Sequence, residues 1–200
     1  MRVLEDLLET PSQTAGPYVH IGLTPNFSGI SGVYDDDLGT SLFRGDRPAN
    51  TITVSGHVYD GTGTPLKDGL LEIWQADAHG VYPGRPGADP NFTGWGRQAT
   101  DMETGQFRLE TIKPGPVPFR DGRLQAPHIT VWIVARGINL GLHTRAYFAD
   151  EADANAQDPI LSRIEHQNRV PTLLAQPNSD GDYAFDIHLQ GPQETIFFDI

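Results

Sequence analysis

Histidines are the residues of this sequence best suited to bind a transition metal, yet none of the seven lies close to another. They stand at positions 20, 57, 79, 128, 143, 166 and 188. Side chains on one strand face repeat every two residues, so a strand offers two imidazoles to one ion as His-x-His. Two positions after His128 stands Thr130, whose neutral hydroxyl is a poor ligand for such a metal. The spacing excludes a local two-histidine site.

Asp186 and His188 are a second pair of possible ligands on one strand face. Charged strand faces are usually solvated, so we assign no metal to this pair. The sequence also lacks the motifs of serine hydrolases, phosphate-binding loops, dinucleotide-binding folds and zinc proteases. It contains no cysteine, which excludes thiol nucleophiles, iron–sulfur clusters and thiolate zinc sites and indicates a cytoplasmic protein.

The charge balance narrows the range of partners. The formal charge of -12 comes from 14 basic and 26 acidic side chains. A surface of this sign repels nucleic acid, so we expect no nucleic-acid partner, and an anionic small substrate would need a local arginine. No apolar run is long enough for a signal peptide or a membrane helix, which predicts a soluble protein without a membrane partner.

The elements that would position these residues are short strands separated by turns rich in Gly and Pro. Apolar patterning predicts strands at 51–59, 70–75, 107–111, 128–136, 142–148, 183–189 and 195–200. A turn at 60–65 predicts a hairpin-like reversal after the first strand. Residues 159–167 resemble a helix, with Asp158 as its N-cap and Pro159 at its first position. This spacing predicts an all-β fold, a β-sandwich with short helices and long loops, formed by residues 1–200 as a single domain.

Four segments of the sequence resemble intradiol ring-cleaving dioxygenases. They are residues 10–18 (TPSQTAGPY), 71–77 (LEIWQAD), 111–115 (TIKPG) and 126–129 (APHI). Within this family, some members are built from alpha and beta chains. The first segment, residues 135–139 (ARGIN) and residues 194–199 (ETIFFD) are similar to the alpha chain. The resemblance spans nearly the whole sequence.

The resemblance implies a ferric ion held by two tyrosinates and two imidazoles, all from the beta chain of an alpha–beta protomer in a higher oligomer. Position by position, the first tyrosine of that set falls on Tyr82 and the first histidine on His128. The second tyrosine and histidine positions hold Val117 and Thr130, which cannot replace a phenolate or an imidazole. We therefore expect four vestigial positions, with no metal bound by this chain and no catalytic residue in it.

The resemblance also implies that the alpha chain shapes the partner's substrate pocket. Residues 1–20 would form an N-terminal arm that reaches the beta chain. The arm residues expected to bind substrate are Thr14, Gly16, Pro17 and Tyr18. Glycine adds no side chain, so its backbone can approach an aromatic ring closely. Arg136 would meet the carboxylate of 3,4-dihydroxybenzoate, which the assembly would cleave with O2 and Fe(III) to 3-carboxy-cis,cis-muconate.

Each of these residues also has a plainer interpretation. Tyr82 alone reads as a loop aromatic, His128 as a core histidine, Arg136 as a solvated strand end, and residues 14–17 as a terminal linker. Two alternatives for the whole protein stay open at this point. One is a self-sufficient intradiol catechol dioxygenase, which requires a complete ligand set. The other is a non-enzymatic β-sandwich that serves as a binding or scaffold module.

Overall fold

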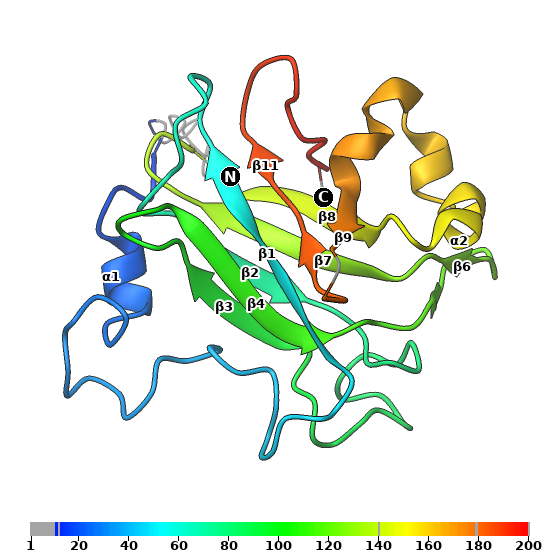
Figure 1. The fold of residues 1–200 in the computed structure, drawn as a ribbon, viewed down its shortest axis with the longest axis horizontal. Helices are drawn as coiled ribbons and strands as arrows, with labels where there is room; N and C mark the ends of the chain where they lie inside the picture. Colours follow the sequence, from blue (N-terminus) through cyan, green and yellow to red (C-terminus); the bar gives the residue numbers. More distant parts are fainter. Residues whose placement is uncertain (1–10, 12, 140, 179, 200) are drawn as a thin grey trace, which may run out of the picture.

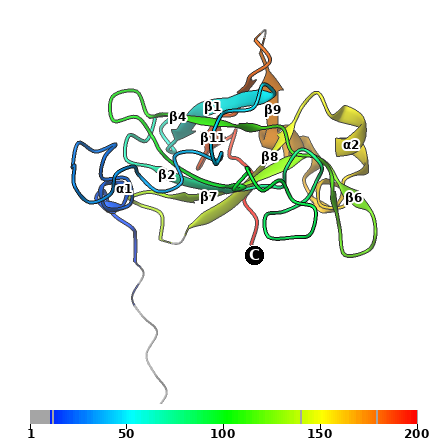
Figure 2. The ribbon, with the colours of Figure 1, turned by 90° about the horizontal axis from the view of Figure 1, so that it is seen from below.

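Two layers of β-strands face each other in the computed structural model, which describes residues 11, 13–139, 141–178 and 180–199 (Figures 1 and 2). The first layer contains β1 (Thr51–Tyr59), β4 (Gln106–Ile112), β10 (Tyr183–Ala184) and β11 (Ile187–His188). The second layer contains β2 (Leu70–Trp74), β3 (Trp95–Ala99), β7 (His128–Val134) and β8 (Leu142–Phe148). The predicted β-sandwich is confirmed.

One strand belongs to both layers. β9 (Leu174–Pro177) pairs in parallel with β8 and antiparallel with β10, so the strands form one continuous path. β7 lies between β2 and β8 and is antiparallel to both. The central position predicted for β7 is confirmed. A short hairpin of β5 (Val117–Pro118) and β6 (Leu124–Gln125) lies outside the main sheet.

The core fills the space between the layers with the inward faces of these strands. β7 contributes Ile129, Val131 and Ile133, each at most 4% exposed. β1 contributes Val54 and Val58 from the opposite layer. Alternate residues of one strand point to one face, so the predicted period of two places these side chains together.

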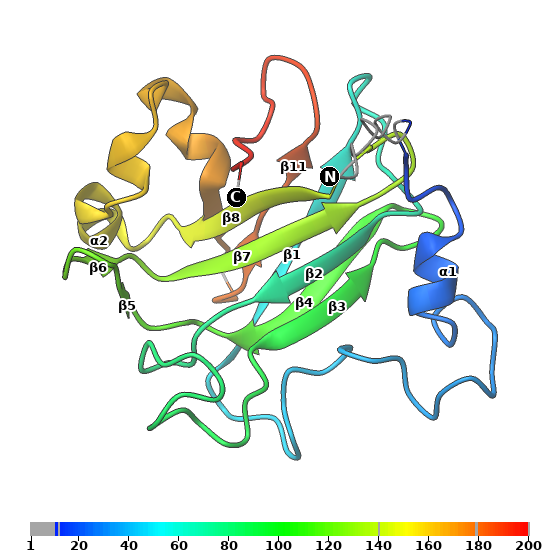
Figure 3. The ribbon, with the colours of Figure 1, turned by 180° about the vertical axis from the view of Figure 1, so that it is seen from behind.

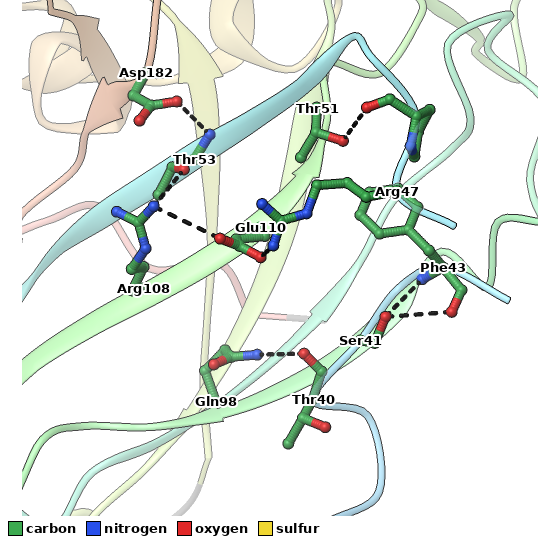
Figure 4. Close-up of polar contacts among 11 residues, drawn as sticks. Thr40, Ser41, Phe43, Arg47, Thr51, Thr53, Gln98, Arg108, Glu110 and Asp182 are labelled. Carbon is green, nitrogen blue, oxygen red and sulfur yellow. Dashed lines mark hydrogen bonds and ion pairs between the residues drawn. The ribbon is translucent and has the colours of Figure 1, made fainter. Parts of the chain in front are cut away.

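The outward face of β1 and β4 carries charge pairs instead. Glu110 pairs with Arg47 and lies 3.6 Å from Arg108, whose guanidinium donates to Thr53 (Figure 4). Asp182 accepts the backbone N–H of Thr53 at 2.7 Å. These contacts fasten the segment before β1 and the start of β10 to the sheet. Exposed pairs of this kind contribute at most about 1 kcal/mol each.

Three predicted elements differ from the structure. The strand expected at 183–189 is split, because the Asp186 carboxylate accepts the backbone N–H of His57 in place of a ladder hydrogen bond. In the described part of the segment 195–200, only a single bridge forms, between Phe198 and His143. The backbone N–H of Ile196 instead binds the hydroxyl of Thr172. The predicted reversal after β1 forms locally, but β2 joins the other layer.

The third predicted element that differs is the helix at 159–167. The structure has two 3-10 segments, Leu161–Arg163 and Gln167–Leu173, and a helix α2 (Ala152–Gln157) that the sequence did not indicate. The other helix is α1 (Val19–Leu23). Among the described residues, no helix is long and apolar enough to span a bilayer.

Asp158 is fully buried and organises this region. One of its oxygens accepts the N–H groups of Ile160 and Leu161 at 2.7 and 2.8 Å, so it caps the first 3-10 turn. Its other oxygen accepts the N–H of Ala126 at 2.8 Å. The predicted capping role of Asp158 therefore holds, although the helix that it caps is shorter. The same carboxylate fixes the backbone just before β7.

We expect Asp158→Ala to lower the free energy of unfolding by roughly 3–5 kcal/mol, because three buried N–H groups lose a charged acceptor. Asp60→Ala is the matched control, since Asp60 also accepts the backbone N–H groups of Thr62 and Thr64 but lies in an exposed turn. Urea unfolding followed by circular dichroism measures both variants. Equal losses in the two variants would contradict the role given to Asp158.

Candidate functional site

Tyr82 lies in a loop after β2 that a buried aspartate holds together. One oxygen of Asp77 accepts the N–H groups of His79 and Val81 at 2.9 and 3.0 Å, and the other accepts that of Asp89 at 2.9 Å. Gly80 has φ 76° and passes so close to Pro116 that a Cβ would lie 2.0 Å from its carbonyl oxygen. Sequence reasoning missed the role of Asp77, although an Asp followed by Gly three residues later is a typical turn signal.

The Tyr82 ring stacks on Trp74, the last residue of β2. Their ring centroids lie 5.9 Å apart and the planes differ by 5°. Burial raises the pKa of the Tyr82 phenol, and the positive charge of Arg145 opposes this only in part.

His128 begins β7 and is 4% exposed. Its Nδ1 donates to the carbonyl of Ala126 at 2.7 Å, in the tautomer that this contact requires. Its Nε2 is buried and has no hydrogen-bond partner among the described residues. Burial, helped by the charge of Arg145, lowers the pKa of His128 to about 4. The imidazole is therefore neutral at physiological pH.

Val117 and Thr130, the two positions where the ligand pattern fails, add no donor suited to ferric iron. Val117 is 2% exposed and pairs with Gln125 in the β5–β6 hairpin. Thr130 is half-buried on β7, with Trp74 and Arg145 as its neighbours on the adjoining strands.

Arg145, on β8, places a positive charge beside these residues. Its guanidinium donates to the amide oxygen of Gln125 at 2.9 Å and to the Tyr147 hydroxyl at 3.2 Å. The same charge shifts the pKa of Tyr82 and of His128. Sequence reasoning missed Arg145. The only signal was its place on a strand next to the one that carries His128.

The donors at these four positions do not fit a ferric ion. They comprise one phenol and one imidazole, with an aliphatic side chain and a neutral hydroxyl in the other places. A cation would also approach a fixed guanidinium. Across the described residues, no group of three or more His, Asp or Glu side chains is arranged to hold a metal.

Thr14 joins the N-terminal segment to the loop after β7, which carries Arg136. Its hydroxyl accepts the N–H of Gly137 at 3.0 Å and donates to the carbonyl of Ala135 at 3.4 Å. The carbonyl of Ala135 and the N–H of Gly137 belong to the residues on either side of Arg136. The side chain of Arg136 is 62% exposed. The structure thus brings together two residues that are predicted to serve the same pocket.

The other arm residues continue from Thr14 along the surface. Gly16 has φ 72°, a conformation that strains any residue with a Cβ. Pro17 is exposed and Tyr18 is 77% exposed, just before α1. Residues 1–10 and 12 of the predicted arm lie outside the described residues. The role of the arm in substrate binding stays a prediction.

Arg136 and the vestigial positions lie at opposite ends of the molecule. His128 is the first residue of β7, and Arg136 follows the end of that strand. At about 3.3 Å per residue, eight residues of extended chain span roughly 25 Å. In Figure 3, the β5–β6 hairpin lies at one end of β7 and helix α1 at the other. One small aromatic molecule cannot contact both groups in this chain.

An open pocket of about 570 Å³ lies beside Arg136. Its apolar wall includes Leu66, Ile138 and Phe197. Asn139 and Glu194 contribute polar groups. The pocket adjoins the Thr14 contact, so an arginine, an apolar wall and an anchored loop meet at one end of the sandwich.

The buried His128 makes stability depend on pH. Because its pKa is about 4 when folded and about 6.5 when unfolded, only the unfolded state binds the proton between these values. The contribution of neutral His128 to the free energy of unfolding is present in full above pH 6.5 and falls by on the order of 3 kcal/mol as pH drops to 4.

His128→Asn keeps an N–H for the carbonyl of Ala126 and removes this titration. We expect the variant to gain stability relative to the wild type as pH falls, measured by urea unfolding. A pH-independent difference would contradict the assignment.

Comparisons with known proteins agree with this architecture. A family model described as "Dioxygenase" matches residues 23–191. The protocatechuate 3,4-dioxygenase alpha chain of Pseudomonas putida is 47% identical over 199 residues, covering 98% of each chain. The protocatechuate 3,4-dioxygenase beta chain of Burkholderia cepacia is 32% identical over 178 residues, covering 82% of this chain and 75% of the relative.

A solved structure shows the same fold. The dioxygenase domain of a dioxygenase and carbohydrate-binding fusion protein from Streptomyces sp. SirexAA-E superposes with a TM-score of 0.55 at 30% identity, covering 84% of this chain and 96% of that one. The strand arrangement, the matched segments and these similarities agree, and the chain belongs to the intradiol dioxygenase family.

Proposed function

We propose that this chain is the alpha subunit of a hetero-oligomeric protocatechuate 3,4-dioxygenase. The assembly cleaves 3,4-dihydroxybenzoate between its two hydroxyl-bearing carbons, using O2 and non-haem Fe(III), to give 3-carboxy-cis,cis-muconate. The beta chain binds the iron. This chain supplies part of the wall of the substrate pocket, and the alpha–beta protomers assemble into a higher oligomer.

The separation of about 25 Å between Arg136 and the vestigial positions carries this proposal. If Arg136 binds the carboxylate of a small aromatic substrate, the reacting ring must lie in a site that another chain completes. A relative named as a beta chain, 32% identical to this chain, shows that the family contains a second type of subunit.

The side chains at the four ligand positions of this chain also support the assignment of iron binding to the beta chain. One phenol and one imidazole beside Arg145 are too few ligands for a trivalent cation. We derive no chemical step in this chain from them. The chain's own contribution is to bind and orient the substrate.

Arg136 would hold the substrate carboxylate, and the arm would close on the ring. A guanidinium presents two parallel N–H groups to a carboxylate, which fixes the direction of the ring as well as its charge. Gly16 and Pro17 would bring backbone close to the ring, since neither projects a long side chain. Thr14 and Tyr18 lie on either side of this pair. The geometry selects for a carboxylated catechol over catechol itself.

Mixing the purified chain with its beta chain tests the subunit assignment. We expect O2 uptake with protocatechuate only in the mixture, because the beta chain alone lacks part of the pocket and this chain lacks iron ligands. The measurement is made with an oxygen electrode and by iron analysis of each polypeptide. Stoichiometric ferric iron with a visible tyrosinate band in this chain alone would refute the assignment of roles.

Arg136→Ala should raise KM for protocatechuate at least about tenfold, because a charge-assisted contact contributes roughly 1.5–3 kcal/mol. Steady-state kinetics of the assembled enzyme measure the change. Arg123→Ala is the matched control, since Arg123 also pairs with an aspartate at 2.8 Å but lies in the β5–β6 hairpin. An unchanged KM for Arg136→Ala would favour a scaffold role for this chain.

A further inference from the structure

We infer that Asp68 is a positioning residue for Arg136 and thereby helps to determine the specificity for a carboxylated substrate. This inference rests on the proposed function, in which Arg136 binds the carboxylate. Asp68 lies just before β2 and is 68 positions away from Arg136 in the sequence. Its Oδ2 lies 2.8 Å from Nε of Arg136.

The contact uses only one nitrogen of the guanidinium. Within the described part of the chain, neither terminal nitrogen of Arg136 donates a hydrogen bond. The Arg136 side chain is 62% exposed, whereas that of Asp68 is only 10% exposed. The buried Asp68 carboxylate therefore contacts the guanidinium at Nε. The two terminal nitrogens of Arg136 are left to bind a ligand with two oxygens.

The backbone next to Asp68 is held by hydrogen bonds. The next residue, Gly69, exchanges hydrogen bonds with Thr100 in both directions: its N–H donates to the Thr100 hydroxyl at 2.9 Å, and its carbonyl accepts the Thr100 N–H at 2.9 Å. Thr100 is fully buried. The backbone that carries Asp68 is thus held against the sheet at Gly69.

The backbone of Arg136 is held from the other side. The Thr14 hydroxyl bonds the carbonyl of Ala135 and the N–H of Gly137, the two residues that flank it. Arg136 has long and flexible side-chain torsions that this backbone contact does not restrict. The pairing with Asp68 is the contact that restricts them.

Stability does not account for this arrangement. The second oxygen of Asp68 is buried without a hydrogen-bond partner among the described residues, which is unfavourable for a folded protein. Its ion pair has an exposed arginine as partner, and such pairs add little stability. Local features that disfavour stability are expected at functional sites. The role of the Asp68 carboxylate is therefore to orient the Arg136 guanidinium rather than to stabilise the fold.

Asp68→Ala in the assembled enzyme tests the inference. We expect KM for protocatechuate to rise roughly three- to tenfold with kcat unchanged, because the arginine remains but is no longer directed. Catechol lacks the carboxylate, so its inhibition constant as a competitor should not change. Asp68→Asn keeps an oxygen that can face the Nε–H, and its KM should lie between those of the wild type and Asp68→Ala.

A double-variant cycle separates positioning from a general structural effect. In an Arg136→Ala background, Asp68→Ala should have no further effect on KM, because the group that it directs is gone. Asp121→Ala is the matched control: Asp121 also pairs with an arginine at 2.8 Å, in the β5–β6 hairpin, and its loss should leave KM unchanged.

Three results would overturn the inference. They are an unchanged or lowered KM in both Asp68 variants, a parallel weakening of catechol binding, and an Asp68→Ala effect that persists without Arg136. The proposed function fails separately, if Arg136→Ala itself leaves KM unchanged. A raised KM in Arg136→Ala with wild-type values in both Asp68 variants removes Asp68 alone.

Discussion

The extended backbone of β7 imposes the distance on which the functional argument depends. Seven residues of strand, held antiparallel to β2 on one side and β8 on the other, cannot shorten or bend to bring their ends together. His128 and Arg136 are therefore assigned to different regions by the backbone alone. In the proposed function, this distance is the reason why Arg136 serves a site that another chain completes.

Two buried aspartates hold the backbone around Tyr82 and His128. Asp77 still shapes the Tyr82 loop, and Asp158 still fixes the backbone before His128. Both aspartates accept hydrogen bonds from backbone N–H groups. Every residue except proline has such a group, whatever its side chain. The scaffold can therefore persist after the ligands themselves are replaced.

The sequence predicted the elements whose patterns are long and regular. β1 and β8 match their predicted bounds, and β7 is central as expected. The strand predicted at 195–200 was wrong in the described part of that segment, because Ile196 and Phe198 pack against the cluster that contains Tyr147 and Leu173 and the N–H of Ile196 binds the Thr172 hydroxyl. The helix at 159–167 was wrong because the Asp158 cap starts only one 3-10 turn. Short elements of this kind depend on tertiary contacts that local propensity does not contain.

For the candidate site, the sequence predicts which residues take part, which stays a prediction, but it does not predict how they are arranged. The motifs pointed to Tyr82, His128 and Arg136 because those positions carry a recognisable pattern of residue types. Asp68 and Arg145 act on them from neighbouring strands or loops, and nothing in their own sequence surroundings marks them. Such contacts arise only when distant segments of the chain come together, which is a property of the folded sheet order rather than of any local pattern.

The way β10 and β11 pair with β1 has a consequence for how the chain matures. These strands lie beside β1 in parallel, and the Thr53 to Asp182 hydrogen bond joins residues 129 positions apart. Pairings of such long range are slow to form, since loop closure precedes any gain from contact. During synthesis, the edge of β1 that pairs with β10 and β11 therefore stays unpaired until almost all of the polypeptide has left the ribosome.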